Sequence, residues 1–251
     1  MPSVSIITPC FNSEKYLACT IESVIAQTFK DWEMFIIDDC SADASYSIAK
    51  RYAEKDKRIK VFKNDKNMSA CYCRNFAITL SSAKYIAFLD SDDIWHPQKL
   101  ETQIDFMKKN NCDFSFSEYE LIDSKNKLLN QQIRVINHLT YKKNLIHNFP
   151  GCLTVMYDRE SIGLIDGQKE GMADDFSLFL NALKRSKNAM GIKKVLAQYR
   201  KHKSSISYNR IPMIKNHFYV LHTLEKKPFI LSVFFLITHI TVLLFWKKRK
   251  V

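Results

Sequence analysis

The chain has 251 residues, which is enough for one large domain or for one domain with an appendage. Its hydrophobic content of 46% is ordinary for a globular protein with a sizeable core. The net charge of +12 indicates an anionic partner, but neither an aromatic-basic RNA signature nor zinc-finger spacing is present, which disfavours nucleic acid.

Strands and helices are predicted to alternate through the first half of the chain. Four apolar, β-prone runs are separated by segments whose apolar residues recur at helical spacing. Strands are expected at 4–8, 32–37, 59–62 and 85–89, and helices around 17–25, 48–53, 70–80 and 97–107. This alternation is typical of βαβ units, which build a mainly parallel sheet with helices on both faces.

The pattern becomes mixed past Cys112. Strands are expected at 112–116, 153–157 and 195–199, and helices at 140–148 and 176–183. Between residues 117 and 149 the spacing of apolar residues favours no element clearly. The second half of the chain is therefore predicted to be α/β without regular βαβ repeats.

A carboxylate cluster follows the strand at 85–89, where Asp90, Asp92 and Asp93 stand within four residues. Ligands of open α/β sheets bind at this carboxyl edge. Like charges so close together repel unless a cation neutralises them, and oxygen ligands suit Mg²⁺ or Mn²⁺. Such an ion usually completes its shell with substrate phosphates, so we expect a phosphorylated ligand here. A solvated acidic turn is the alternative.

These pieces together resemble glycosyltransferase family 2 proteins of GT-A fold, and most of all bacterial enzymes that build O-antigen, capsule or teichuronic-type polysaccharides. The resemblance covers about residues 3–207. The segments that carry it are the strand and loop at 4–12, the Asp-Asp turn at 36–43, the Arg-Asn ending at 67–75, Asp-x-Asp at 90–92, the acidic-aromatic segment at 171–180 and the loop at 199–207. It implies a nucleotide-sugar-binding half at 1–116 and an acceptor and catalytic-base half at 117–207.

By this resemblance, one group of residues binds the nucleotide. Phe11 would stack on uracil, Asp39 would accept the imide N–H with Asp38 supporting its loop, and Asp90 would contact the ribose. The nucleotide-binding residues implied are Pro9, Phe11, Asp38, Asp39, Arg74 and Asp90. The family usually has glycine where Met68 and Ser69 stand.

A second group would carry the chemistry. The resemblance implies that Asp92 holds Mg²⁺ or Mn²⁺ on the diphosphate and that Asp175 is the general base. Asp174 stands where the family has glutamate and would support the base, and His202 is a candidate contact to the diphosphate or metal. One base without a protein nucleophile implies a single displacement with inversion.

We therefore expect an inverting hexosyl- or N-acetylhexosaminyltransferase that uses a UDP-sugar and a lipid-linked saccharide acceptor. Two alternatives remain open. A sugar-phosphate nucleotidylyltransferase would need an early Gly-rich phosphate loop, whereas the first glycine here is Gly151. A non-catalytic membrane-bound binding module would not need acids at three separate strand or helix ends.

The C-terminal region differs in composition. A basic linker is expected at 208–227, an uncharged helix at 228–246 and a basic tail at 247–251. The uncharged stretch approaches the roughly 20 residues that span a bilayer. We expect a membrane-associated helix that holds the enzyme at the cytoplasmic face of the inner or plasma membrane, with a buried core helix as the alternative. No signal peptide precedes the first strand, and seven cysteines without metal-site spacing indicate reduced thiols.

Overall fold

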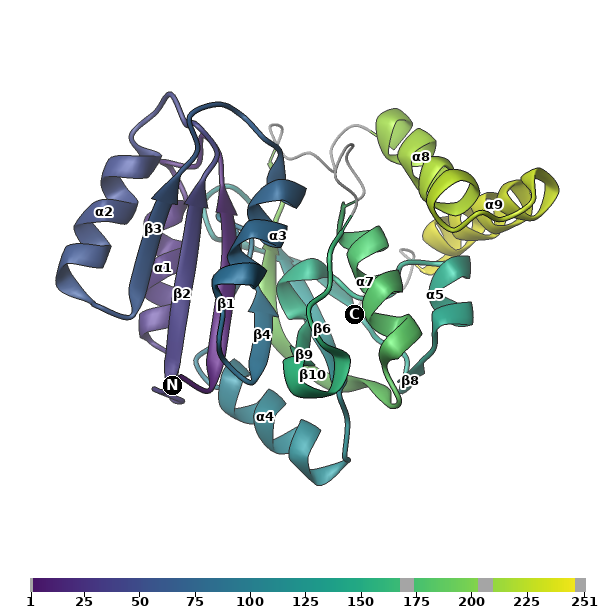
Figure 1. The fold of residues 1–251 in the computed structure, drawn as a ribbon, viewed down its shortest axis with the longest axis horizontal. Helices are drawn as coiled ribbons and strands as arrows, with labels where there is room; N and C mark the ends of the chain where they lie inside the picture. Colours follow the sequence, from purple (N-terminus) through teal and green to yellow (C-terminus); the bar gives the residue numbers. More distant parts are fainter. Residues whose placement is uncertain (1, 168–173, 203–209, 247–251) are drawn as a thin grey trace.

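The computed structural model describes residues 2–167, 174–202 and 210–246. Its first half alternates strands and helices, as the apolar runs predict. The elements are β1 (Val4–Cys10), α1 (Leu17–Ile25), β2 (Trp32–Asp38), α2 (Ser45–Lys55), β3 (Ile59–Lys63), α3 (Ala70–Leu80), β4 (Tyr85–Phe88), β5 (Ile94–Trp95) and α4 (Lys99–Lys109). Because β1 pairs in parallel with β2 and β4, and β2 with β3, the carboxyl ends of these four strands share one edge (Figure 1).

The second half extends the same sheet. Its elements are β6 (Phe114–Ile122), β7 (Leu128–Ile133), β8 (His138–Leu139), α5 (Tyr141–Ile146), β9 (Met156–Asp158), α6 (Arg159–Ile162), α7 (Asp174–Arg185) and β10 (Ala189–Arg200). The strand order is β3-β2-β1-β4-β9-β6-β10-β5, with β7 paired to β6 and β8 to β10. Strand β9 is antiparallel to both neighbours, so β6 and β10 end at the same edge as β1 and β4. The predicted α/β fold with a mixed, largely parallel sheet is confirmed.

The run at 153–157, expected as one strand, is divided. A 3₁₀ turn (Cys152–Thr154) comes first and β9 follows it. Thr154 causes the division, because its N–H and its hydroxyl both donate to the carbonyl of Gly151, at 2.9 and 2.7 Å. A buried apolar run does not reveal such a turn, since burial is the same in both conformations.

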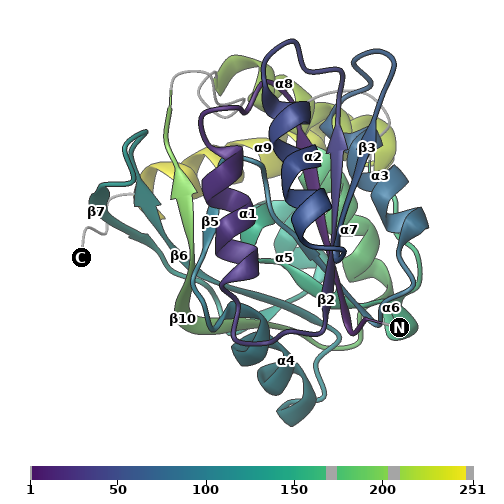
Figure 2. The same ribbon diagram turned by 90° about the vertical axis from the view of Figure 1, so that its left-hand side faces the viewer.

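Helices cover both faces of the sheet. Alternate residues of β1 point to opposite sides, so Ile6 packs with α1, α2 and α4, whereas Ile7 packs with α3, α6 and α7. Figure 2 shows α1 and α2 on the near side of the first strands. Each face therefore has its own apolar core, and the loops at the strand ends lie at the rim between the two helix layers.

The stretch at 208–227, expected as a basic linker, is helical over most of the part that the structure describes. It contains α8 (Arg210–Tyr219) and a π-helical turn, η3 (Val220–Leu224), and α9 (Phe229–Trp246) follows. Val220 and Leu221 are fully buried against Phe176 and Leu180 of α7. Ile214, Phe218 and Leu221 recur at helical spacing, so the sequence does carry a helical signal here, which the basic composition of the stretch obscures.

Helix α9 closes one end of the molecule, beside α5 and α8 (Figure 1). Several of its large apolar side chains face solvent: Phe229, Ile230, Leu231, Phe234 and Ile237. In the part of the chain that the structure describes, we find no helix with the length and hydropathy needed to cross a bilayer. The structure thus shows the expected apolar helix docked against the domain along one side.

Candidate active site

The loop after β4 is fastened from two sides. The hydroxyl of Thr20 donates to the carbonyls of Ser91 and Asp93, at 3.0 and 2.8 Å. From β10, the backbone N–H of Arg200 donates to Asp93 Oδ1 at 2.8 Å, and Arg200 Nε donates to the carbonyl of Asp92 at 2.6 Å. Burial raises the pKa of Asp93 well above its usual value, and Asp92 and Asp90 add to the effect. Asp93 is thus a structural carboxyl that joins β10 to this loop.

Asp92 remains available at the rim. Its side chain is 26% exposed, and its Oδ2 lies 2.7 Å from Nε2 of His202, whose ring packs on Tyr16. The structure therefore brings together two residues that the sequence proposed separately. No set of three His, Cys, Asp or Glu side chains among the described residues could hold a metal ion by itself. A rim carboxylate nevertheless suits Mg²⁺ or Mn²⁺ when a substrate diphosphate supplies the other ligands.

Arg74 forms a buried ion pair with Asp90. Helix α3 delivers the guanidinium, which is almost fully buried, to the carboxylate loop. Burial alone would lower the pKa of Arg74, but Cys152, Asp90 and Asp175 raise it above its usual value. The arginine thus stays charged between two acidic groups, where it can also attract a diphosphate.

Asp175 lies in the first turn of α7, on the other side of Arg74. Its Oδ2 accepts a long hydrogen bond, 3.4 Å, from Asn148 Nδ2. Burial raises the pKa of Asp175, Arg74 opposes the rise and Asp90 adds to it. A raised pKa suits a general base that must take a proton near neutral pH. Helix α7 begins at Asp174, whose side chain lies outside the description, as do residues 168–173 and 203–209.

The sequence did not predict three neighbours of this base. Asn148 holds its carboxylate, and Tyr119 and Cys152 interact with it electrostatically. A Cβ on Gly151 would lie 2.8 Å from Cε1 of Tyr119, so only glycine lets this ring approach the backbone so closely. In this weakly patterned region the sequence offered one indication of a close contact, namely Gly151, the first glycine of the chain, directly after a proline.

On the expected nucleotide side, the loop after β1 presents Phe11. Its ring is 49% exposed, whereas Pro9 within β1 is buried. Asn12 takes a left-handed φ of 48° and ties this loop to the loop after β2, donating its N–H to Ser41 Oγ and accepting the N–H of Ala42. An exposed aromatic ring on a fixed loop is suited to stacking on a base.

The two aspartates after β2 serve their own loops. Asp39 is 2% exposed, and it accepts the N–H groups of Met68 and Ser69 at 2.7 and 2.8 Å and an amide N–H of Asn64 at 2.8 Å. Asp38 Oδ2 accepts the N–H of Ser41 at 3.1 Å. The observed contacts of Asp39 thus hold the loop before α3, and its contact with a base stays a prediction.

Five of the seven free cysteines are buried. Burial, assisted by nearby aspartates, raises the pKa of Cys10 and of Cys73 to about 12. Burial likewise raises the pKa of Cys71 and of Cys112 to about 11, and that of Cys152 well above its usual value. These thiols remain protonated near neutral pH.

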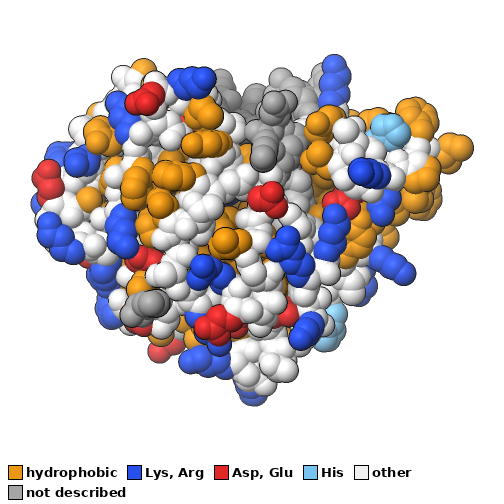
Figure 3. All heavy atoms as spheres, viewed as in Figure 1, with side chains coloured by type: hydrophobic (Ala, Val, Ile, Leu, Met, Phe, Trp, Pro, Cys, Tyr) orange, Lys and Arg blue, Asp and Glu red, His pale blue; other side chains and the backbone are white. Residues whose placement is uncertain are grey.

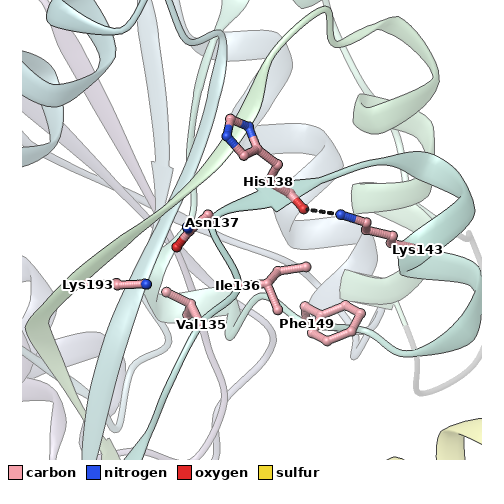
Figure 4. A pocket seen from close by; sticks show the side chains of 7 residues that line it. All are labelled: Val135, Ile136, Asn137, His138, Lys143, Phe149 and Lys193. Carbon is pink, nitrogen blue, oxygen red and sulfur yellow. Dashed lines mark hydrogen bonds between the residues drawn. The ribbon is translucent and has the colours of Figure 1, made fainter.

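A cavity of about 550 Å³ lies beside β8 and β10 (Figure 4). Its lining residues are Val135, Ile136, Asn137, His138, Lys143, Phe149 and Lys193. His138 pairs with Met190 near the start of β10, whereas Arg200 at the other end of that strand touches Asp93. The cavity is thus not part of the carboxylate site.

A mixed α/β sheet with an Asp-x-Asp loop and a helix-borne carboxylate at one rim defines the GT-A class of nucleotide-sugar enzymes. Solved structures agree on the fold. S. aureus TarS 1–349 with UDP-GlcNAc matches with a TM-score of 0.70 at 19% identity, over 88% of this chain and 67% of that chain. The mannosyltransferase PcManGT from Pyrobaculum calidifontis, solved with GDP-Man and Mn²⁺, matches with a TM-score of 0.67 at 16% identity, over 94% and 70%.

The chain belongs to Glycosyl transferase family 2, whose model matches residues 5–162. It is 39% identical over 228 residues to TuaG of Bacillus subtilis (strain 168), a protein named for teichuronic acid biosynthesis, covering 91% of this chain and 90% of TuaG. It is 35% identical over 243 residues to the UDP-Glc:alpha-D-GlcNAc-diphosphoundecaprenol beta-1,3-glucosyltransferase WfgD of Escherichia coli, covering 95% and 92%. The protein is therefore a glycosyltransferase, and the nucleotidylyltransferase and binding-module alternatives fall away.

Proposed function

We propose that this enzyme transfers a hexosyl residue, with glucosyl as the first choice, from a UDP-sugar to a saccharide carried on a polyprenyl diphosphate. The transfer inverts the anomeric carbon and serves the synthesis of a cell-surface polysaccharide. The observation that carries the proposal is the convergence of Asp92, Arg74 and Asp175 at one rim of the sheet. The donor and acceptor named for WfgD support the choice of substrates.

The reaction needs one base. Asp175 takes the proton of the acceptor hydroxyl while the hydroxyl oxygen forms its bond to the anomeric carbon. At the same time the bond from that carbon to the β-phosphate oxygen breaks, and UDP leaves. A carboxylate within hydrogen-bond reach of the hydroxyl contributes about 10²–10⁴-fold. Attack from the face opposite the leaving diphosphate inverts the anomeric carbon, so an α-linked donor gives a β-linked product.

The leaving diphosphate needs positive charge. Arg74, kept charged by its two acidic neighbours, lies close to the Asp-x-Asp loop. Asp92 would hold Mg²⁺ or Mn²⁺, and the ion, when bound, neutralises charge that develops on the diphosphate. His202 at Asp92 is positioned to contact the same group.

The acceptor and the C-terminal helix together indicate work at a membrane surface. The exposed apolar side chains of α9 follow Lys226 and Lys227 in the chain, and four basic residues come after the helix: Lys247, Lys248, Arg249 and Lys250. Basic residues near an anionic leaflet each add on the order of 1 kcal/mol to binding. We place the enzyme at the cytoplasmic face, where nucleotide-sugars are available, with α9 in contact with lipid.

The test is transfer with a defined acceptor. The full chain is incubated with UDP-glucose, Mn²⁺ and an α-GlcNAc diphosphate carrying a short alkyl chain, and UDP release and product mass are measured. A product that β-glucosidase cleaves supports both the transfer and its stereochemistry. Absence of transfer from UDP-glucose and other UDP-hexoses to this acceptor, by a preparation that binds UDP, would overturn the proposed substrates.

A further inference from the structure

Helix α9 contacts the protein with its more polar face. Ser232, Phe235 and His239 recur at helical spacing on the side turned toward the domain, where Ser232 is fully buried. Ile230 and Ile237 lie on the opposite side, 83% and 58% exposed, and apolar side chains gather over this end of the molecule in Figure 3. This polarity is the reverse of an ordinary surface helix. The apolar outer face of α9 is suited to contact with lipid. The polar residues on its inner face contact the domain.

His239 joins a column of stacked rings. Its ring lies on His217 of α8, with centroids 4.0 Å apart and planes 24° apart, and His217 lies on Phe176 of α7, at 4.1 Å and 10°. On its other side, Nδ1 of His239 lies 3.1 Å from Nδ1 of His147, the residue after α5, so that one nitrogen donates and the other accepts. The column thus connects α9 with α8, α7 and the end of α5.

Both ends of the column adjoin the base. Phe176 directly follows Asp175, and His147 directly precedes Asn148, whose side chain donates to the Asp175 carboxylate. Helix α9 therefore contacts the chain neighbour of Asn148 directly, and it reaches the chain neighbour of Asp175 through His217 of α8. Rotation or loss of the His239 ring would change the positions of residues 147–148 and 175–176 together.

The middle ring of the column is uncharged. Burial, with smaller contributions from His239 and His147, lowers the pKa of His217 to about 2, so this ring is uncharged throughout the working pH range. Glu225 fixes the hairpin of α8 and α9 independently, because it accepts the hydroxyl of Tyr141 at 2.5 Å and pairs with Lys184 at 2.7 Å. The rings therefore act through shape and position.

We propose that α9, beyond contacting lipid, positions the catalytic base: His239 and Asn148 are positioning residues that set the Asp175 carboxylate against the acceptor hydroxyl. This inference rests on the proposed function, in which Asp175 is the base. It makes the membrane-contacting helix part of the active-site framework, so that contact with the bilayer and alignment of the base depend on one element.

The first measurement is a pH-rate profile of Asn148→Ala. The amide N–H stabilises the charged form of Asp175, so its removal raises the pKa of that carboxyl. A base works only when deprotonated, so the acidic limb of kcat moves to higher pH. The titratable groups around Asp175, namely Arg74, Asp90, Tyr119, Cys71 and Cys152, are unchanged in this variant.

The second measurement concerns His239→Ala in the full chain, assayed with UDP-glucose and the short-chain acceptor so that membrane binding does not contribute. We expect kcat to fall about 10–10²-fold through misplacement of the base, with the donor KM within twofold. His239→Phe, which keeps a ring in the column, should recover most of this loss. His222→Ala, at an exposed histidine of the same hairpin, is the matched control and should keep wild-type kcat.

The double variant His239→Ala/Asn148→Ala decides whether the two residues act together. Residues that act through one carboxylate give a combined loss clearly smaller than the product of the single losses. The inference would be overturned by any of three results. These are a double-variant loss equal to the product of the single losses in kcat, an acidic limb that does not shift in Asn148→Ala, and a wild-type kcat in His239→Ala. Asp175→Asn tests the premise separately: if that variant stays active, the proposed base is wrong, whatever His239 does.

Discussion

The active-site rim has a donor side, around the Asp90–Asp93 loop, and a base side, around Asp175. The two sides differ in how far apart in the sequence their contacting residues lie. On the donor side, Arg74 and Asp90 pair across 16 residues and belong to consecutive elements. On the base side, Asn148 reaches Asp175 across 27 residues, and His147 meets His239 across 92. The Arg74–Asp90 pair is thus a local product of the βαβ repeat, although Arg200 of β10 holds the same loop across 107 residues, whereas the base side depends on packing of the C-terminal helices. The donor side should therefore tolerate damage to α9, and the base side should not.

Asp175→Asn is expected to have the largest effect. The amide keeps the shape of the side chain but cannot take a proton, so kcat should fall about 10²–10⁴-fold. UDP affinity should remain near wild type, because the nucleotide contacts that we propose lie on the donor side. Steady-state kinetics and a calorimetric titration with UDP measure the two quantities. Turnover within tenfold of wild type would contradict the role of this carboxylate.

Asp92→Ala tests the donor side. Removing the rim carboxylate should lower kcat about 10²–10³-fold, because the charge on the leaving diphosphate is no longer neutralised. UDP titrations with Mn²⁺ and with EDTA should differ for the wild type and coincide for the variant. Asp105→Ala, an exposed position on α4, is the control. Equal UDP affinity with and without the ion in the wild type would argue against a metal bridge.

Asp39→Ala should act mainly on binding. The carboxylate holds the N–H groups of Met68 and Ser69, so its loss loosens the loop before α3 and leaves these partly buried donors without this acceptor, at a cost of about 1–3 kcal/mol. The donor KM should rise about tenfold while kcat changes less, because these contacts are similar in the ground and transition states. A loss confined to kcat would point to a role in the chemical step instead.

Ser69→Gly should have the smallest effect, and of opposite sign. Ser69 has φ 87° and ψ 154°, a conformation nearly confined to glycine, at a cost of about 1–3 kcal/mol. Glycine removes this strain but adds backbone entropy in the unfolded chain and loses the weak cap to Tyr72, so a net gain of about 1 kcal/mol is expected. Thermal unfolding measures it. Ser69→Ala keeps the strain and loses the cap, so it should be less stable than the wild type.

The same contrast explains which elements and site residues could be predicted from the sequence alone. Helix 70–80 and the first four strands follow from apolar spacing, because each buries a regular stripe or run against its neighbours. The acidic residues at strand ends follow from that pattern and from the family resemblance. Asn148 and His239 could not be predicted, since their roles depend on which helices meet, and neither stands in a motif. The family's glycine at the position of Ser69 was an indication of its positive φ, because glycine adopts such a conformation readily.

The state of the thiols has a practical consequence for labelling. Thiolates react with maleimides and thiols do not, so five buried cysteines with raised pKa values are slow to react. Cys19 and Cys40 are the two half-exposed positions, and Cys40 lies in the loop directly after Asp39. With Cys19 replaced by serine, a fluorophore would attach at Cys40 without further engineering. With that one change the chain carries a single half-exposed thiol, next to the aspartate that we propose contacts the nucleotide base, so a fluorophore there would test nucleotide binding directly.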